Sequence, residues 1–186
     1  MRAFVAVKVA EWIRRKLVGV QDELRRTEAD VKWVEDANLH ITLKFLGWID
    51  DAAVTNLKGL LAAEALRWPR LRLDYAGVGT FPERGAPRVV WAGCTGDVAK
   101  LGELAAAVEG AAEQMGVPRE DRPFKPHLTI GRVKSPRNLK QLQAALEPFR
   151  ATAFGADEVG EFILFESTLR PQGPIYTPQA VFGLGG

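Results

Sequence analysis

The two histidines of this chain occur in matching sequence contexts, and these contexts restrict the fold more than any other feature. His40 and His127 are each followed by an apolar residue, a threonine and another apolar residue, the threonines being Thr42 and Thr129. Because side chains alternate between the two faces of a β-strand, each histidine would share a face with its threonine, while the apolar residues point the other way. The sequence therefore predicts two half-buried strands, each with an imidazole and a hydroxyl on its polar face.

This combination of groups suits proton transfer at a phosphodiester. Imidazole has an ordinary pKa near neutrality, so one charged ring could protonate a leaving oxygen while a neutral ring accepts a proton from the attacking hydroxyl. The hydroxyls of Thr42 and Thr129 would hold the nonbridging oxygens. A single histidine on a strand is more often structural, and only the duplication favours catalysis by His40 and His127. The residues leave open which ring is the acid, because the two contexts are so alike.

Other uses of reactive side chains fit the sequence less well. A zinc site needs three or four ligands, and no carboxylate lies in either motif, although Asp36 or Asp74 could approach. The sequence around Cys94 is typical of the end of a strand, which predicts a buried, inert thiol. No glycine-rich segment has the pattern of a phosphate-binding loop. We therefore expect a protein without metal or other cofactor.

Charge and composition limit the class of partner. The net charge of +2 on 186 residues is too small for a general nucleic-acid-binding surface, so an anionic partner must be bound locally. Residues 119–140, which surround His127, are rich in basic side chains: Arg119, Arg122, Lys125, Arg132, Lys134, Arg137 and Lys140. A solvated basic face is the usual explanation of such a run, but its position favours anion binding.

The same features predict a cytoplasmic protein that does not bind membranes. A single cysteine excludes an internal disulfide and fits a reducing compartment. The first residues lack the long apolar core of a signal peptide, and no segment has the length and hydropathy of a membrane span.

The hydrophobic pattern predicts an α+β fold with two lobes. Strands are expected at 3–9, 32–34, 39–46, 71–78, 88–93, 127–133, 151–154, 161–169 and 176–182. Helices are expected at 11–26, 50–66, 97–115 and 138–146. The order of helix, strand and His-x-Thr occurs twice without a linker, so residues 1–186 are expected to form one bilobal domain with pseudo-equivalent halves.

Residues 38–47 (NLHITLKFLG) and 123–133 (PFKPHLTIGRV) resemble the two-histidine (2H) phosphoesterases. The most similar branch is the RNA 2′,3′-cyclic phosphodiesterases, also called 2′-5′ RNA ligases, and the resemblance extends to residues 2–6 and 75–82. It implies two pseudo-symmetric lobes of mainly antiparallel sheet, with outer helices and both motifs in a central cleft. It also implies metal-independent hydrolysis of a terminal 2′,3′-cyclic phosphate to a 2′-phosphomonoester, with His40 as proton donor and His127 as proton acceptor. The reverse reaction would be 2′-5′ ligation.

The family pattern also draws attention to the fifth position after each histidine, which is Phe45 in the first motif and Arg132 in the second. Regular alternation would put both residues opposite the histidines. For Phe45 this favours a core aromatic over a stacking platform for a base. For Arg132 we expect a bulge or a strand end at Gly131 that turns the guanidinium toward phosphate.

Three further residues are candidates for substrate contacts. Alternation places Lys44 on the face of His40, where it would either contact phosphate or simply be solvated. Phe124 and Lys125 directly precede the second motif and are weaker candidates of the same kind.

The expected partner is RNA with 2′,3′-cyclic phosphate ends, such as tRNA fragments or short oligonucleotides, bound by a monomer. Two alternatives remain open at this point. One is a noncatalytic module that binds RNA ends, and the other is a phosphoesterase for small cyclic phosphates.

Overall fold

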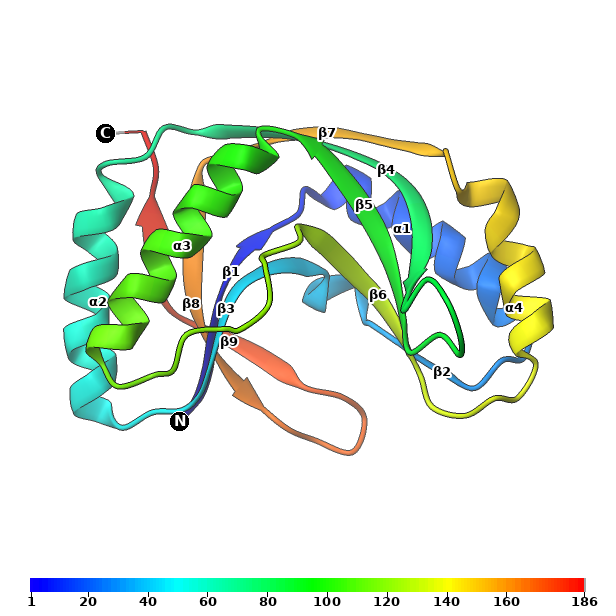
Figure 1. Ribbon diagram of the computed structural model, residues 1–186, viewed down its shortest axis with the longest axis horizontal. Helices are drawn as coiled ribbons and strands as arrows, with labels where there is room; N and C mark the ends of the chain where they lie inside the picture. The colour runs from blue at the N-terminus through cyan, green and yellow to red at the C-terminus, as the bar shows by residue number, and fades with distance from the viewer. Residues whose placement is uncertain (186) are drawn as a thin grey trace.

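The computed structural model describes residues 1–185 and shows an α+β fold built on two antiparallel sheets (Figure 1). The four-stranded sheet, ordered β3-β1-β8-β9, consists of β1 (Arg2–Lys8), β3 (His40–Trp48), β8 (Glu161–Thr168) and β9 (Ile175–Gly183). The five-stranded sheet, ordered β2-β6-β5-β4-β7, consists of β2 (Val31–Trp33), β4 (Leu71–Phe81), β5 (Val89–Gly96), β6 (His127–Val133) and β7 (Ala153–Val159). We call the first sheet with its helices lobe A and the second lobe B.

The helices are exchanged between the lobes. They are α1 (Glu11–Arg25), α2 (Asp51–Ala65), α3 (Val98–Gln114) and α4 (Leu139–Leu146). Figure 1 shows α2 and α3 beside the sheet of lobe A, and α1 and α4 beside that of lobe B. Thus α1 follows a strand of lobe A but covers lobe B, and α3 follows a strand of lobe B but covers lobe A.

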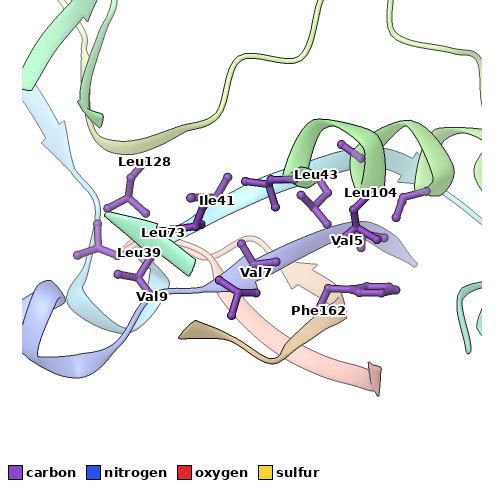
Figure 2. Packing of buried hydrophobic residues seen from close by; sticks show 14 of the residues in the cluster. Val5, Val7, Val9, Leu39, Ile41, Leu43, Leu73, Leu104, Leu128 and Phe162 are labelled. Atoms are coloured by element: carbon purple, nitrogen blue, oxygen red, sulfur yellow. The ribbon is translucent and has the colours of Figure 1, made fainter. Parts of the chain in front are cut away.

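Most of the buried hydrophobic residues of both lobes form one continuous cluster, and a second, small cluster consists of Phe4, Ala6, Ile163 and Phe165. Figure 2 shows side chains from β1, β3, α3 and β8 of lobe A together with Leu73 and Leu128 of lobe B. Leu39, directly before β3, and Ile41 and Leu43 in β3 point into the large cluster, as the alternation of apolar residues predicts. The polar face of the motif strand is therefore held by packing on its reverse side.

The helix α1 is attached to lobe B by its apolar stripe and by its first turn. Ile13, Leu17 and Leu24 recur at helical spacing and are fully buried. The carboxylate of Asp157 on β7 accepts a hydrogen bond of 2.8 Å from the backbone N–H of Ala10, which caps the helix. An acceptor with negative charge at this end also interacts favourably with the helix dipole.

The predicted fold class is confirmed, and each expected helix and strand is present. The largest difference in bounds concerns one strand, since residues 151–154 were expected and β7 spans Ala153–Val159, while β4 and β5 each end three residues later than expected. Gly155, with φ of 114°, and the capping residue Asp157 interrupt the apolar alternation that would have revealed the full length of β7. Among residues 1–185, no helix combines the length and apolar character needed to cross a bilayer.

Candidate active site

The strands that carry the two His-x-Thr motifs contact each other where the lobes touch. His40 begins β3 and His127 begins β6, and these strands contact each other at the centre of the molecule (Figure 1). Arg132, on β6, exerts its charge on both His40 and Tyr176 of lobe A. The structure thus brings Arg132, on the strand of the second motif, within electrostatic range of the first histidine.

Each imidazole is oriented by a hydrogen bond between its Nδ1 atom and a backbone carbonyl oxygen. The Nδ1 atom of His40 lies 2.6 Å from the carbonyl oxygen of Asn38, and that of His127 lies 2.7 Å from the carbonyl oxygen of Lys125. A carbonyl oxygen only accepts hydrogen bonds, so Nδ1 carries the hydrogen in each ring. The Nε2 atoms are therefore left to exchange protons with a substrate.

Aromatic rings pack against each imidazole in a related way. The ring of Tyr176 meets His40 edge-on at 5.4 Å, and the ring of Phe81 meets His127 edge-on at 5.2 Å. Phe4 adds a second contact to His40 at 5.0 Å between ring centroids. These contacts, from strands of the same lobe in each case, limit tilting of the imidazoles.

The two sites differ in the surroundings of His40. Both histidines are partly buried, and the Nε2 atom of His40 lies 2.8 Å from the hydroxyl oxygen of Thr42. Burial lowers the pKa of His40 below its ordinary value of 6.5, the hydrogen bond to Asn38 acts in the opposite direction, and the charge of Arg132 lowers it further. The neutral ring is thus favoured in the ligand-free protein. A cavity of about 110 Å³ lies beside His40 and is lined by Lys8 and other residues of lobe A.

A β-bulge after the first motif reverses the alternation that the sequence predicted. Thr42 pairs with Ala6 of β1 and Lys44 pairs with Val5, so Leu43 has no partner of its own. The extra residue places Lys44 and Phe45 on the opposite faces from those that regular alternation would give them. Phe45 consequently lies on the face of His40 and is 64% exposed, which corrects the prediction of a core aromatic.

The same bulge places Lys44 on the opposite side from the one predicted. Its side chain is 5% exposed, and Nζ lies 2.6 Å from a carboxylate oxygen of Glu109 on α3. It also donates a hydrogen bond of 2.8 Å to the carbonyl oxygen of Pro118, while Glu109 accepts one of 3.0 Å from the backbone N–H of Glu120. Lys44 therefore links β3 to the connection that leads toward His127, and its predicted position on the histidine face was wrong.

The second motif carries an equivalent bulge, and here the expectation was correct. Thr129 pairs with Trp91 and Gly131 with Val90, so Ile130 is the unpaired residue. Arg132 is thereby turned onto the face of His127 and is exposed. No carboxylate of residues 1–185 lies within 4 Å of its guanidinium. Its contact with phosphate stays a prediction.

The bulge in β6 is supported by groups that sequence reasoning did not identify. The side-chain amide of the buried Gln21 donates hydrogen bonds to the carbonyl oxygens of Ile130 at 2.9 Å and Val34 at 2.8 Å. A Cβ on Gly131 would lie 2.8 Å from Trp33, so only glycine fits under that ring. Gln21 lies far from Ile130 in the sequence, and no local signal relates the two.

The remaining candidates have structural surroundings. Phe124 is partly buried against the hydrophobic cluster, and Lys125 is exposed and supplies the carbonyl group that orients His127. Burial raises the pKa of the Cys94 thiol to about 11, which keeps it protonated and unreactive. Asp36 forms an ion pair with Arg14 rather than approaching a histidine. Within residues 1–185, no three histidine, cysteine or acidic side chains are grouped as metal ligands.

Comparison with known proteins agrees with this geometry. The family model described as the 2′-5′ RNA ligase superfamily matches residues 14–161. The chain belongs to this superfamily. A relative from Archaeoglobus fulgidus, named RNA 2′,3′-cyclic phosphodiesterase, is 38% identical over 98% of this chain and 99% of its own length. A relative of the same name from Aquifex aeolicus is 38% identical over 100% of this chain and 98% of its own length.

The similarity of this 2′-5′ RNA ligase superfamily member to solved structures extends over the whole fold. A crystal structure of a Thermus thermophilus protein has a TM-score of 0.83 and 31% identity, covering 100% of this chain and 99% of that one. The structure of E. coli LigT in complex with 3′-AMP has a TM-score of 0.81 and 26% identity, covering 100% and 98%.

The electrostatic link between the motifs of this superfamily member can be tested by NMR. The His127→Ala variant leaves His40 as the only histidine of the chain, so its titration can be followed without overlap. In that background, Arg132→Gln should raise the pKa of His40, because a positive charge that disfavours the imidazolium is removed. Lys134→Gln, an exposed cation on the same segment, is the matched control and should leave it unchanged. Equal pKa values in both variants would contradict the placement of Arg132.

Proposed function

We propose that this protein hydrolyses the 2′,3′-cyclic phosphate ends of RNA to 2′-phosphomonoesters by acid–base catalysis with two histidines. The observation that carries the proposal is the matched orientation of His40 and His127, whose Nδ1 atoms both donate to backbone carbonyls at the start of strands that touch. The names of the relatives, RNA 2′,3′-cyclic phosphodiesterase, support the same activity.

In the proposed mechanism, water attacks the phosphorus atom of the cyclic ester. Nε2 of His127 accepts a proton from this water, and the protonated Nε2 of His40 donates a proton to the 3′ oxygen as its bond to phosphorus breaks. Thr42, Thr129 and Arg132 would hold the nonbridging oxygens and stabilise the charge that develops on them. The products are a 2′-phosphomonoester and a 3′-hydroxyl, and the two rings return to their starting states by proton exchange with solvent.

This assignment requires His40 to be protonated when the substrate is bound. In the ligand-free protein the pKa of His40 is lowered, chiefly by burial. A bound phosphate would place a negative charge beside the ring and favour the imidazolium. Binding of the anionic substrate would thus supply the acid that the reaction needs. If a ribose 5′-hydroxyl replaced water as the nucleophile that gives its proton to His127, the same opening of the cyclic ester would yield a 2′-5′ linkage and a free 3′-hydroxyl.

We propose as substrates the ends of RNA fragments, including tRNA fragments and short oligonucleotides, and we propose that a cytoplasmic monomer acts on them without a cofactor. The large hydrophobic cluster that includes residues of both sheets supports treating residues 1–186 as one domain. Within residues 1–185, the guanidinium of Arg132 is not paired with a carboxylate, which supports local binding of phosphate by a chain whose net charge is only +2.

Phosphorus NMR of the reaction product tests the proposed function. An oligonucleotide ending in a 2′,3′-cyclic phosphate should yield a 2′-phosphomonoester, and EDTA should leave the rate unchanged because no step uses a metal. Binding without product would support the noncatalytic module. A cyclic mononucleotide turned over as well as the oligonucleotide would favour a phosphoesterase for small cyclic phosphates. Loss of activity in EDTA would contradict the mechanism.

A further inference from the structure

We propose that Phe45, Trp48 and Arg2 form a binding strip for the last unpaired nucleotides of a single-stranded RNA 3′ end. This inference rests on the proposed function, because it assigns to the same active site a substrate class, which is unpaired RNA rather than a duplex end or a cyclic mononucleotide. The three residues lie at the end of β1 and β3 that is distant from His40.

Two large aromatic side chains are exposed on β3 without a packing reason. Phe45 is 64% exposed and Trp48 is 81% exposed, although aromatic rings are usually buried in a folded protein. Exposed aromatic side chains that lie close together often mark a surface that binds a partner. Both rings belong to the strand that carries the first His-x-Thr motif.

The strand register places these residues on the face of His40. Phe45 pairs with Phe4 and Trp48 pairs with Arg2, and Phe4 and Arg2 point to the same face of β1 because they are two residues apart. A second bulge between these pairs, with Gly47 at φ of 69°, keeps Trp48 on that face. The strip is therefore continuous with the active-site surface.

Ring contacts connect the histidine to the strip. Ring centroids of His40 and Phe4 are 5.0 Å apart, and those of Phe4 and Phe45 are 6.2 Å apart. A nucleotide whose phosphate lies at His40 would therefore have an aromatic surface beside it that leads to Phe45 and then to Trp48.

The spacing of the two exposed rings selects unpaired bases. Three residues of strand separate Phe45 from Trp48 by roughly 10 Å, whereas stacked bases of a helix follow each other at about 3.4 Å. Neighbouring bases can stack on both rings only when they are splayed apart, as they are in single-stranded RNA. A duplex end would present one closed stack and could not use both rings.

Charge on this surface favours a nucleic acid over an apolar partner. Arg2 is exposed, and its charge reaches Tyr176, where it opposes the rise in pKa that burial causes. Arg132 acts on the same tyrosine. Arg2 is the strand partner of Trp48, and a guanidinium group beside an exposed aromatic ring matches the alternation of phosphates and bases along a single strand.

The test compares specificity constants for three substrates with cyclic phosphate ends: a mononucleotide, a single-stranded oligonucleotide, and a hairpin paired to its last base. The wild type should prefer the single strand. Trp48→Ala should lower the ratio of kcat/KM for the single strand to that for the mononucleotide by about 5- to 100-fold, the effect of losing one base–aromatic stack. Trp48→Phe should retain most of the preference, because it keeps an aromatic ring.

Trp12→Ala is the matched control, since Trp12 is 58% exposed on α1 and lies outside the strip. It should leave the ratio unchanged. Equal loss on all three substrates in Trp48→Ala, or no loss, would overturn the binding strip while leaving the proposed function intact. If the wild type turned over none of the substrates, the proposed function would fail, and fluorescence anisotropy of a labelled single strand would still test the strip. Trp48→Ala should then weaken binding more than Trp12→Ala does.

Discussion

Replacement of either His40 or His127 by alanine should reduce turnover of a 2′,3′-cyclic phosphate by at least about 10²-fold, the low end for loss of a general acid or base. Each ring is fixed through Nδ1 and has no substitute within its motif, since the chain contains only these two histidines. Single-turnover kinetics with a cyclic-ended oligonucleotide would measure the chemical step itself.

The two single variants and the double variant together identify a shared role. If both rings act on the same phosphorus atom, the double variant should be little slower than either single variant, because residues that act as a unit are not additive. Circular dichroism would verify that the fold is retained, and binding of the product would show that the site still forms. A fully active double variant would refute the mechanism.

Replacement of Lys44 by methionine should destabilise the protein by about 3–5 kcal/mol, because Glu109 would keep a buried charge without its partner. The ion pair is among the least exposed in the described chain, with 5% exposure for Lys44 and 15% for Glu109. Urea denaturation would measure the change in the free energy of unfolding.

The double variant Lys44→Met/Glu109→Met separates the contribution of the charges to stability from the contribution of side-chain packing. Removing both partners should restore much of the lost stability, because no unpaired charge is left and the apolar volume is kept. Arg119→Met is a suitable control, because Arg119 forms an exposed ion pair with Glu113 of α3, the helix that also carries Glu109. This substitution should lower the free energy of unfolding by no more than about 1 kcal/mol. Equal losses in Lys44→Met and Arg119→Met would contradict the importance of burial.

Much of the fold could be predicted because its local patterns are strong. Apolar residues at strand or helix spacing marked nearly all elements, and the repeated His-x-Thr pattern indicated the two strands that carry the candidate site. The assignment of helices to lobes was beyond the sequence, since the pattern of α1 shows an apolar face but not which sheet it covers.

The bulges explain where the site predictions succeeded and failed. At Leu43 nothing in the sequence marks an extra residue, because a bulge depends on how the partner strand pairs, and so Lys44 and Phe45 were placed on the wrong faces. In the second motif, Gly131 suggested an irregularity, and the face of Arg132 was predicted correctly. The hydrogen bond that Gln21 donates to Ile130 and the one that Glu109 accepts from Lys44 join segments far apart in the sequence. No local sequence signal predicts either of them.

The exchange of α1 and α3 between the lobes has a consequence for how the molecule comes apart. Each sheet is covered by a helix that follows a strand of the other sheet along the chain. Cutting the chain between the motifs would therefore remove an apolar cover from both sheets. Neither fragment would keep its fold alone. Unfolding of either half would also disrupt the relative placement of the two imidazole rings. A destabilising change in one lobe should therefore lead to unfolding of both lobes in a single cooperative transition.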